Sequence, residues 1–126
     1  MAKKILLVDD EKDILLVMGK RIEGWGYDLS TASSGKDALE LIKENIFDLA
    51  IIDFMMPDMD GVTLLKKIRE KNKEIPVIMF TAYPTSDTIK GAEHLGVNAF
   101  IPKLSVHANI EKMLEEAIRI NIKQEK

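Results

Sequence analysis

Two short segments of this sequence place carboxylates at the end of apolar runs. Asp9 and Asp10 follow the run at residues 4–8, and Asp53 is the last residue of the run at residues 48–53. A charge at the end of a buried strand is costly unless something compensates it. If the two runs are neighbouring parallel strands, the carboxylates meet at one edge of a sheet. A hard divalent cation with oxygen ligands, Mg²⁺ or Mn²⁺, would relieve their repulsion there.

A hydroxyl and a cation follow two further apolar runs. Thr81 comes directly after residues 76–80, and Lys103 directly after residues 99–102. A phosphoryl group on a carboxylate needs positive charge and hydrogen-bond donors around its oxygens, which a metal, a lysine and a hydroxyl supply. Aspartate is a known covalent phosphoryl acceptor. The pattern predicts that Asp53 is such an acceptor, with Thr81 and Lys103 beside it.

The elements that must position these side chains alternate between short apolar runs and longer amphipathic segments. Four runs are apolar on both faces, which is typical of parallel strands buried on both sides, and a fifth alternates as an edge strand does. Strands are predicted at residues 4–8, 27–32, 48–53, 76–80 and 99–102. Apolar residues at helical spacing predict helices at residues 12–24, 34–44, 61–71 and 106–122, with a short fourth helix from about residue 86.

Repeated strand–helix units predict an α/β fold, because each crossover between parallel strands is right-handed. The expected topology is a flavodoxin-like (βα)5 three-layer sandwich, a five-stranded parallel sheet with strand order 2-1-3-4-5. Ser33 or Ser34 is expected to cap the second helix, and Ser86 or Asp87 the fourth. Gly91 inside the fourth helix costs about 1 kcal/mol relative to alanine, so this helix is expected to be the least stable.

Length and composition limit the classes of protein to consider. The chain has 126 residues, which predicts a single domain over residues 1–126. The net charge of −3 argues against a nucleic-acid or anionic-membrane partner. There is no cysteine, which excludes disulfides, thiolate metal ligands and a cysteine nucleophile, and a cytoplasmic location is expected. The first apolar run is too short for a signal peptide, and no run has the length of a membrane span.

Four segments in this order and spacing resemble the CheY-like receiver domain of two-component response regulators: "ILLVDDEKDI", "DLAIIDFMMPDMDG", "IMFTAY" and "AFIPK". The resemblance covers essentially the whole chain. It implies that Asp53 takes a phosphoryl group from a sensor histidine kinase or a histidine phosphotransfer protein, or autophosphorylates from small donors. It also implies that Asp9 or Asp10 binds Mg²⁺ together with Asp53 and the backbone carbonyl of Met55.

The resemblance also assigns the residues that respond to the phosphoryl group. Thr81 and Lys103 become phosphate sensors, and Phe100 becomes an aromatic residue that changes rotamer on activation. Lacking the hydroxyl of tyrosine, Phe100 is expected to favour a buried position more than tyrosine would. The fourth helix, fifth strand and fifth helix would form the partner surface. The resemblance to this family implies a phosphoacceptor switch rather than an enzyme.

Two departures from the family pattern carry expectations. Leu104 follows Lys103 where proline is usual, and a cis peptide before leucine costs several kcal/mol, so a trans bond is favoured. Met55 and Tyr83 lie two residues after Asp53 and Thr81, and neither offers an acid or amide to orient water. Slow self-dephosphorylation is therefore expected.

The same residues argue against two other functions. A haloacid-dehalogenase-like phosphatase needs an acid two residues after its nucleophile, where this chain has Met55. A flavodoxin-type carrier needs a phosphate-binding first loop, which the acids in "DDEKD" would repel. The alternative hypothesis to a phosphoacceptor is a phosphorylation-independent binding module on the receiver fold. No DNA-binding segment is recognised, so we expect either a stand-alone receiver or the N-terminal domain of a longer regulator. The expected state is a monomer or a weak phospho-dependent dimer. The expected target is a protein that the sequence does not identify.

Overall fold

Strands and helices alternate along the chain in the computed structural model, which describes residues 2–82, 85–103 and 110–122. The elements in chain order are β1 (Lys4–Val8), α1 (Lys12–Gly24), β2 (Asp28–Ala32), α2 (Gly35–Glu44), β3 (Leu49–Ile52), α3 (Gly61–Lys71), β4 (Val77–Thr81), α4 (Ser86–His94), β5 (Ala99–Pro102) and α5 (Ile110–Asn121). The strands form one parallel sheet in the order β2-β1-β3-β4-β5, which confirms the predicted topology.

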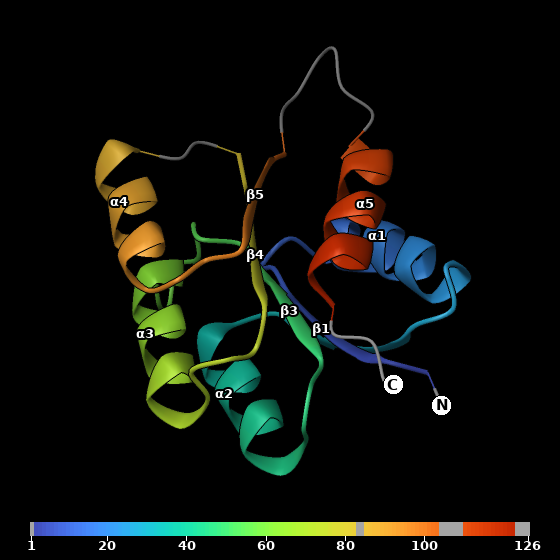
Figure 1. Ribbon diagram of the computed structural model, residues 1–126, viewed down its shortest axis with the longest axis horizontal. Coiled ribbons are helices and arrows are strands. Elements are labelled where there is room, and N and C mark those ends of the chain that lie inside the picture. The colour runs from blue at the N-terminus through green and yellow to red at the C-terminus, as the bar shows by residue number, and fades with distance from the viewer. Residues whose placement is uncertain (1, 83–84, 104–109, 123–126) are drawn as a thin grey trace.

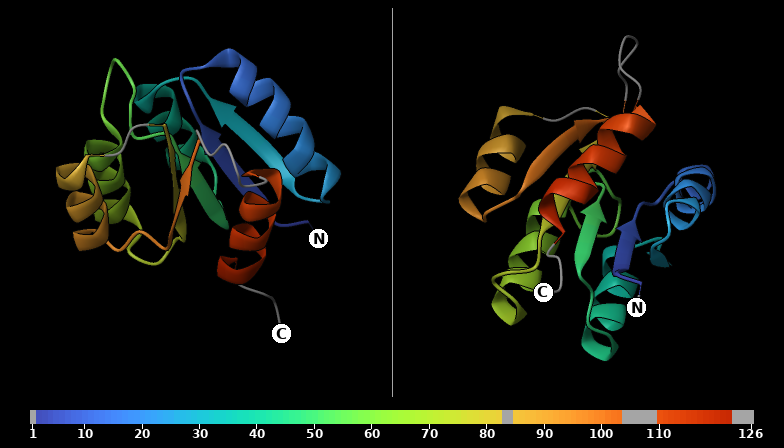
Figure 2. Two further views of the ribbon diagram at one scale, coloured as in Figure 1. Left: turned by 90° about the horizontal axis from the view of Figure 1, so that it is seen from above. Right: turned by 45° about the vertical axis from the view of Figure 1, so that its right-hand side comes forward.

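The helices form two layers around this sheet. α1 and α5 cover one face, and α2, α3 and α4 cover the other (Figure 1). The view from above and the view turned about the vertical axis show the same three layers (Figure 2). None of the helices in the described ranges has the length and apolar character needed to cross a membrane.

The boundaries of the elements differ little from those predicted. The strand predicted at residues 27–32 begins at Asp28, and the one predicted at residues 76–80 ends one residue later, at Thr81. The first residues predicted for the fifth helix, 106–109, lie outside the described residues.

The inner strands supply two apolar cores, one on each face of the sheet. Ile5 and Leu7 of β1 pack in the core under α1 and α5, whereas Leu6 and Val8 pack in the core under α2, α3 and α4. These four side chains are fully buried. Burial of successive residues on opposite faces explains why the inner strands read as continuous apolar runs. The rigid sheet that results fixes where its strands end.

The residues that cap two of the helices agree only in part with the prediction. Ser34 caps α2 by accepting a hydrogen bond from the Asp37 N–H at 3.1 Å, as expected. The cap of α4 is Thr85, which accepts from the Thr88 N–H at 3.1 Å, so the assignment of Ser86 or Asp87 was wrong. Several consecutive polar residues can each cap a helix, and only the backbone conformation shows which of them is extended and precedes it.

α4 is expected to exchange its amide hydrogens faster than α1. It buries only Ala92, whereas α1 buries Met18 and Ile22, and most helical stability in proteins comes from a packed apolar face. Native-state hydrogen exchange with residue-level readout would measure this difference. Gly91 inside α4 favours the same outcome. Equal protection of the two helices would contradict the expectation.

Candidate functional site

β1 and β3 are neighbouring parallel strands, and each is followed directly by an aspartate. Val8 at the end of β1 is the register partner of Ile52 at the end of β3. The ladder continues past these residues, because the Asp53 N–H donates to the Val8 carbonyl at 2.9 Å. The Asp9 N–H donates to the carbonyl of Ala32, the last residue of β2, at 3.0 Å. Backbone pairing thus holds both aspartates where the strand order reverses, as predicted.

Asp9, Asp10 and Asp53 form a cluster of carboxylates. One oxygen atom from each lies within 4.8 Å of the other two. Asp9 and Asp53 are 0% and 2% exposed, and Asp10 is half-buried. Burying carboxylates this close together is unfavourable without compensating cations or hydrogen bonds.

The other aspartates in the loop after β3, Asp58 and Asp60, have structural roles. Asp60 caps α3 by accepting a hydrogen bond from the Thr63 N–H at 2.7 Å. Asp58 accepts hydrogen bonds from the N–H groups of Gly35 and Lys36, at 3.2 and 3.3 Å, at the start of α2. The loop that begins at the acceptor candidate is therefore tied to the N-terminal ends of two helices.

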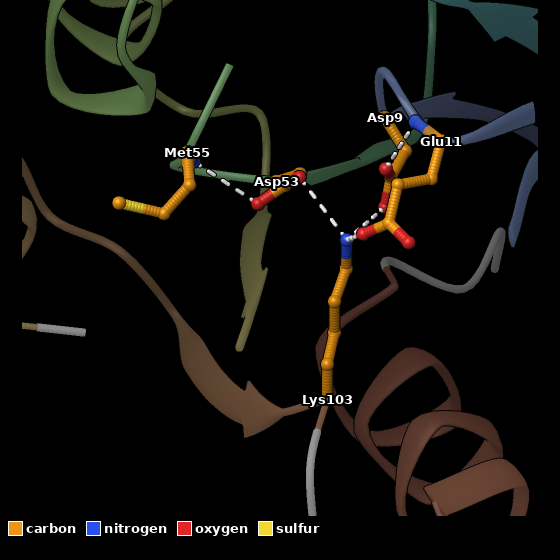
Figure 3. A network of polar contacts seen from close by, with 5 residues as sticks. All are labelled: Asp9, Glu11, Asp53, Met55 and Lys103. Atoms are coloured by element: carbon orange, nitrogen blue, oxygen red, sulfur yellow. Dashed lines mark hydrogen bonds and ion pairs between the residues drawn. The ribbon is translucent and has the colours of Figure 1, made fainter. Parts of the chain in front are cut away.

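Lys103 directly follows β5, and its ammonium group lies among the carboxylates (Figure 3). Its Nζ is 2.7 Å from Oδ2 of Asp9 and 3.1 Å from Oδ2 of Asp53. Oε1 of Glu11 lies 2.9 Å from the same nitrogen. The ring of Phe80 has its centre 5.7 Å from Nζ, a distance at which an aromatic face attracts a cation. Lys103 thus supplies part of the positive charge that the cluster needs.

Backbone N–H groups orient the remaining oxygen of each buried aspartate. The Met55 N–H donates to Oδ1 of Asp53 at 3.0 Å, and the Glu11 N–H donates to Oδ1 of Asp9 at 2.9 Å. In both cases the donor lies two residues after the acceptor, as in an Asx turn. Met55 is therefore at the site through its backbone. The ligand role expected for its carbonyl stays a prediction.

Thr81 ends β4 beside Lys103, and its side chain is fully buried. Its carbonyl accepts a hydrogen bond from the Lys103 N–H at 3.0 Å. Its hydroxyl has no hydrogen-bond partner among the described residues. Buried hydroxyls are nearly always paired, so this one is available to a ligand oxygen.

Burial and charge shift the pKa values of the site. Burial of Asp9 raises the pKa of its carboxyl from 3.8 to about 6, although the contacts with Lys103 and the Glu11 N–H oppose the shift. Burial and the charge of Asp53 raise the pKa of Asp10. Burial alone would lower the pKa of Lys103, but its hydrogen bonds to Asp9, Glu11 and Asp53 outweigh this and raise it. Lys103 is therefore charged at neutral pH, whereas charge on Asp9 is unfavourable.

Replacing Asp9 by asparagine is expected to stabilise the protein at neutral pH when no divalent cation is present. The folded-state pKa of about 6 lies above the ordinary 3.8, so the stability that Asp9 contributes is highest below pH 3.8 and falls as the pH rises to about 6. Asparagine resembles the protonated form, so the gain at pH 7 should be about 3 kcal/mol. Urea unfolding of both proteins in a chelator at pH 4, 5, 6, 7 and 8 would measure it. A gain that does not grow between pH 4 and pH 7 would contradict this assignment.

Phe100 is partly exposed, and its expected preference for a buried position relative to tyrosine stays a prediction. The residue is 37% exposed and lines a groove of about 260 Å³ with Ile89 and Ala92 of α4 and with its register partner on β4, Met79. β5 is an edge strand, and α4 buries only Ala92, so the helix layer covers this part of the sheet incompletely.

The donor set fits a small divalent cation. Carboxylate oxygens of Asp9, Asp10 and Asp53 converge within 4.8 Å, and Mg²⁺ and Mn²⁺ prefer oxygen ligands of this kind. Burial raises the pKa values of Asp9 and Asp10, so negative charge on these carboxylates is unfavourable in the absence of a cation. A bound cation would offset that cost.

Glu11 is the site residue that the sequence analysis missed. Its position next to Asp10 was a signal, because a third acid follows the pair in "VDDE". Two expectations fall outside the described residues: the geometry of the bond between Lys103 and Leu104, and the surroundings of Tyr83.

Comparisons with known proteins agree on one family. The family model described as the response regulator receiver domain matches residues 5–115. The transcriptional regulatory protein ZraR of Escherichia coli is 37% identical over 114 residues, which are 90% of this chain but 26% of that protein. This chain thus spans about a quarter of that relative's length.

Solved structures give the same result. A response regulator receiver domain protein (CheY-like) from Methanospirillum hungatei superposes with a TM-score of 0.87 at 30% identity, covering 95% of this chain and 94% of that one. The response regulator TrrA of Thermotoga maritima, solved in complex with Mg²⁺-BeF, has a TM-score of 0.76 at 28% identity, covering 91% and 98%.

Proposed function

The chain belongs to the receiver-domain family of two-component response regulators, and from that premise we propose that Asp53 is its phosphoryl acceptor. Receiver domains are phosphoacceptor switches of phosphorelay signalling rather than classical enzymes. The observation that carries the proposal is the position of Asp53 between a backbone N–H donor and an ammonium. Met55 N–H holds Oδ1 at 3.0 Å, and Lys103 Nζ holds Oδ2 at 3.1 Å. Both donors fix the orientation of the carboxylate, which would act as the nucleophile.

The transfer is a displacement at phosphorus. A carboxylate oxygen of Asp53 forms the new bond to phosphorus, and the bond to the donor breaks. The electron pair of the broken bond leaves with the histidine nitrogen of a phosphohistidine donor, or with the acetate oxygen of acetyl phosphate. Lys103 and Thr81 would contact the phosphoryl oxygens after transfer. In support, Lys103 Nζ is 3.1 Å from Asp53, and the buried Thr81 hydroxyl has no hydrogen-bond partner among the described residues.

Receiver domains bind Mg²⁺ at a cluster of aspartates, and this chain has such a cluster. Asp9, Asp10 and Asp53 would hold the cation, with the Met55 carbonyl as a further oxygen ligand. When bound, Mg²⁺ neutralises charge on the phosphoryl oxygens during transfer. Mn²⁺ would serve in its place. The Mg²⁺-BeF complex of the related TrrA supports this assignment.

The partners follow from the family. Membership implies a histidine kinase or a histidine phosphotransfer protein as the phosphoryl donor. For the output we propose the face formed by α4, β5 and α5, with Phe100 as the residue that changes position. Phe100 is only partly covered and lines the adjacent groove, so its side chain has room for another rotamer.

Residues 1–126 would form one receiver domain, either stand-alone or N-terminal in a longer regulator. It would act as a monomer or a weak phospho-dependent dimer.

Loss of the phosphoryl group is expected to be slow. Met55 is half-exposed beside the acceptor and carries a thioether, which cannot orient an attacking water as an acid or amide would. The half-life of the phosphorylated protein, followed by intact mass after donor removal, should exceed minutes. Met55→Glu should shorten it, because a carboxylate there could accept a proton from water. A minutes-scale half-life in the unmodified protein would contradict this expectation.

The direct test of the acceptor is intact mass after incubation with acetyl phosphate and Mg²⁺. One added phosphoryl group is expected, and it should be absent with chelator and absent in Asp53→Asn. A matched control is Asp48→Asn, which changes an aspartate at the opposite end of β3, where its carboxylate accepts a hydrogen bond from the Lys4 N–H at 2.7 Å. That variant should still gain the group.

The other outcomes have distinct meanings. If no mass is gained in any condition, the chain is a phosphorylation-independent binding module on the receiver fold. A gain that persists in Asp53→Asn would place the acceptor on another residue and overturn the proposal.

A further inference from the structure

Glu11 occupies the N-cap position of α1 but does not cap the helix. Its backbone is extended, with φ −84° and ψ 111°, and its side chain makes no cap hydrogen bond. Glutamate is not among the residues preferred at this position. Its carboxylate instead lies 2.9 Å from Nζ of Lys103, a residue 92 positions away (Figure 3). The side chain thus serves the site rather than the helix.

The ammonium of Lys103 has three donor hydrogens, and three carboxylates surround it. Two of them, Asp9 and Asp53, are buried and belong to the cluster that would hold the cation. Glu11 is different, because its side chain is 59% exposed and it lies outside that cluster. When Asp9 and Asp53 bind a cation, Lys103 would therefore keep its contact with Glu11. Because Glu11 is exposed, water can replace this contact more easily than the other two.

We propose that Glu11 is a positioning residue that competes with the phosphoryl group for Lys103. In the unphosphorylated site Glu11 holds the ammonium at the mouth of the acid cluster. When a phosphoryl group, or an analogue, is bound on Asp53, its oxygens take the donor hydrogen that Glu11 held, and the Glu11 carboxylate turns to solvent. This role rests on the proposed function of Asp53. Glu11 would help to set how strongly the phosphorylated state is favoured over the unphosphorylated one.

A competitor predicts a gain of affinity when it is removed. Glu11→Gln should bind a phosphoryl analogue roughly twofold to fivefold more tightly than the unmodified protein, the range expected for a partly exposed ion pair. Glu11→Asp keeps the charge but is one methylene shorter, so it should also release Lys103 and also bind more tightly. A purely structural role would make both variants bind more weakly.

The experiment is titration calorimetry of beryllium trifluoride into the protein with saturating Mg²⁺. The variants are Glu11→Gln, Glu11→Asp and the control Asp13→Asn, which removes an exposed negative charge from the first turn of α1. The control separates contact with Lys103 from general charge near the site. Melting temperatures of all four proteins show whether any change in affinity reflects folding.

The outcomes separate this inference from the acceptor proposal. Tighter binding by both Glu11 variants, with Asp13→Asn unchanged, supports the competition. Unchanged or weaker binding by Glu11→Gln overturns it, and an equal gain in Asp13→Asn reduces it to general electrostatics. If the unmodified protein does not bind beryllium trifluoride while the Glu11 variants remain folded, the acceptor proposal itself fails.

Discussion

Replacing Lys103 by methionine is expected to lower the free energy of unfolding at pH 7, without divalent cations, by about 3 kcal/mol. Methionine keeps an unbranched apolar side chain but removes the only cation whose contacts with Asp9 and Asp53 are found among the described residues. The Lys103 side chain is 6% exposed and those of its two partners are 0% and 3% exposed, so solvent cannot replace it well. The buried carboxylates would be left uncompensated.

The pH and cation dependence of this loss identify its cause. Without Lys103 the pKa of Asp9 should rise further above its present value of about 6, so the carboxyl takes up a proton more readily in the folded state. The destabilisation should therefore be smaller at pH 5 than at pH 7. Mg²⁺ should recover part of it, because a ligand that binds only the folded state stabilises it.

The measurement is urea unfolding at both pH values, with Mg²⁺ and with chelator. Lys67→Met, on the exposed surface of α3, is the control for loss of a lysine and should change stability little. Equal destabilisation at pH 5 and pH 7 would show that packing, rather than unpaired charge, explains the loss.

Gly61→Ala is the second substitution with a large expected effect, a loss of about 3 kcal/mol. A Cβ at this position would lie 2.5 Å from Cα of Phe54, whose side chain is 1% exposed. The Gly61 N–H also donates to the Phe54 carbonyl at 3.1 Å, so the backbones cannot separate without breaking that contact. The gain in helix propensity from alanine is about 1 kcal/mol at most and does not offset the clash.

Gly24→Ala is a close control for this change. Gly24 is the last residue of α1, and a Cβ there would meet nothing within 4 Å. This variant should be as stable as the parent or slightly more stable, whereas Gly61→Ala should unfold at lower urea and accept phosphate more slowly. The second effect is expected because Phe54 directly follows Asp53, so a shift of its backbone would move the proposed acceptor. Stability of Gly61→Ala equal to that of Gly24→Ala would contradict the close contact.

The sheet was predictable because each inner strand is buried on both faces and so appears as an apolar run. The parallel order followed from strands that alternate with helices long enough for right-handed crossovers. Given that order, the meeting of Asp9 and Asp53 also followed, since residues after neighbouring parallel strands lie together at one edge. Thr81 and Lys103 were found by the same reasoning.

Other features depend on contacts between segments far apart in the chain. The cap of α4 was predicted at Ser86 or Asp87 but is Thr85, because the helix begins one residue earlier than a cap at Ser86 requires. The exposure of Phe100 depends on how little of α4 packs over β5. Neither feature follows from residue type or spacing.

By itself the sequence determined the strand order, the edge at which the carboxylates meet and the presence of Thr81 and Lys103 at the ends of strands along that edge. The hydrophobic periodicity along the chain indicates the strands and helices. The order of these elements then limits the topology and the positions of the strand ends. Only the tertiary structure showed that Glu11 reaches Lys103, that the Thr81 hydroxyl is buried without a partner among the described residues, and that Phe54 packs against Gly61. These depend on side-chain distances within the packed structure, and hydrophobic periodicity does not encode them.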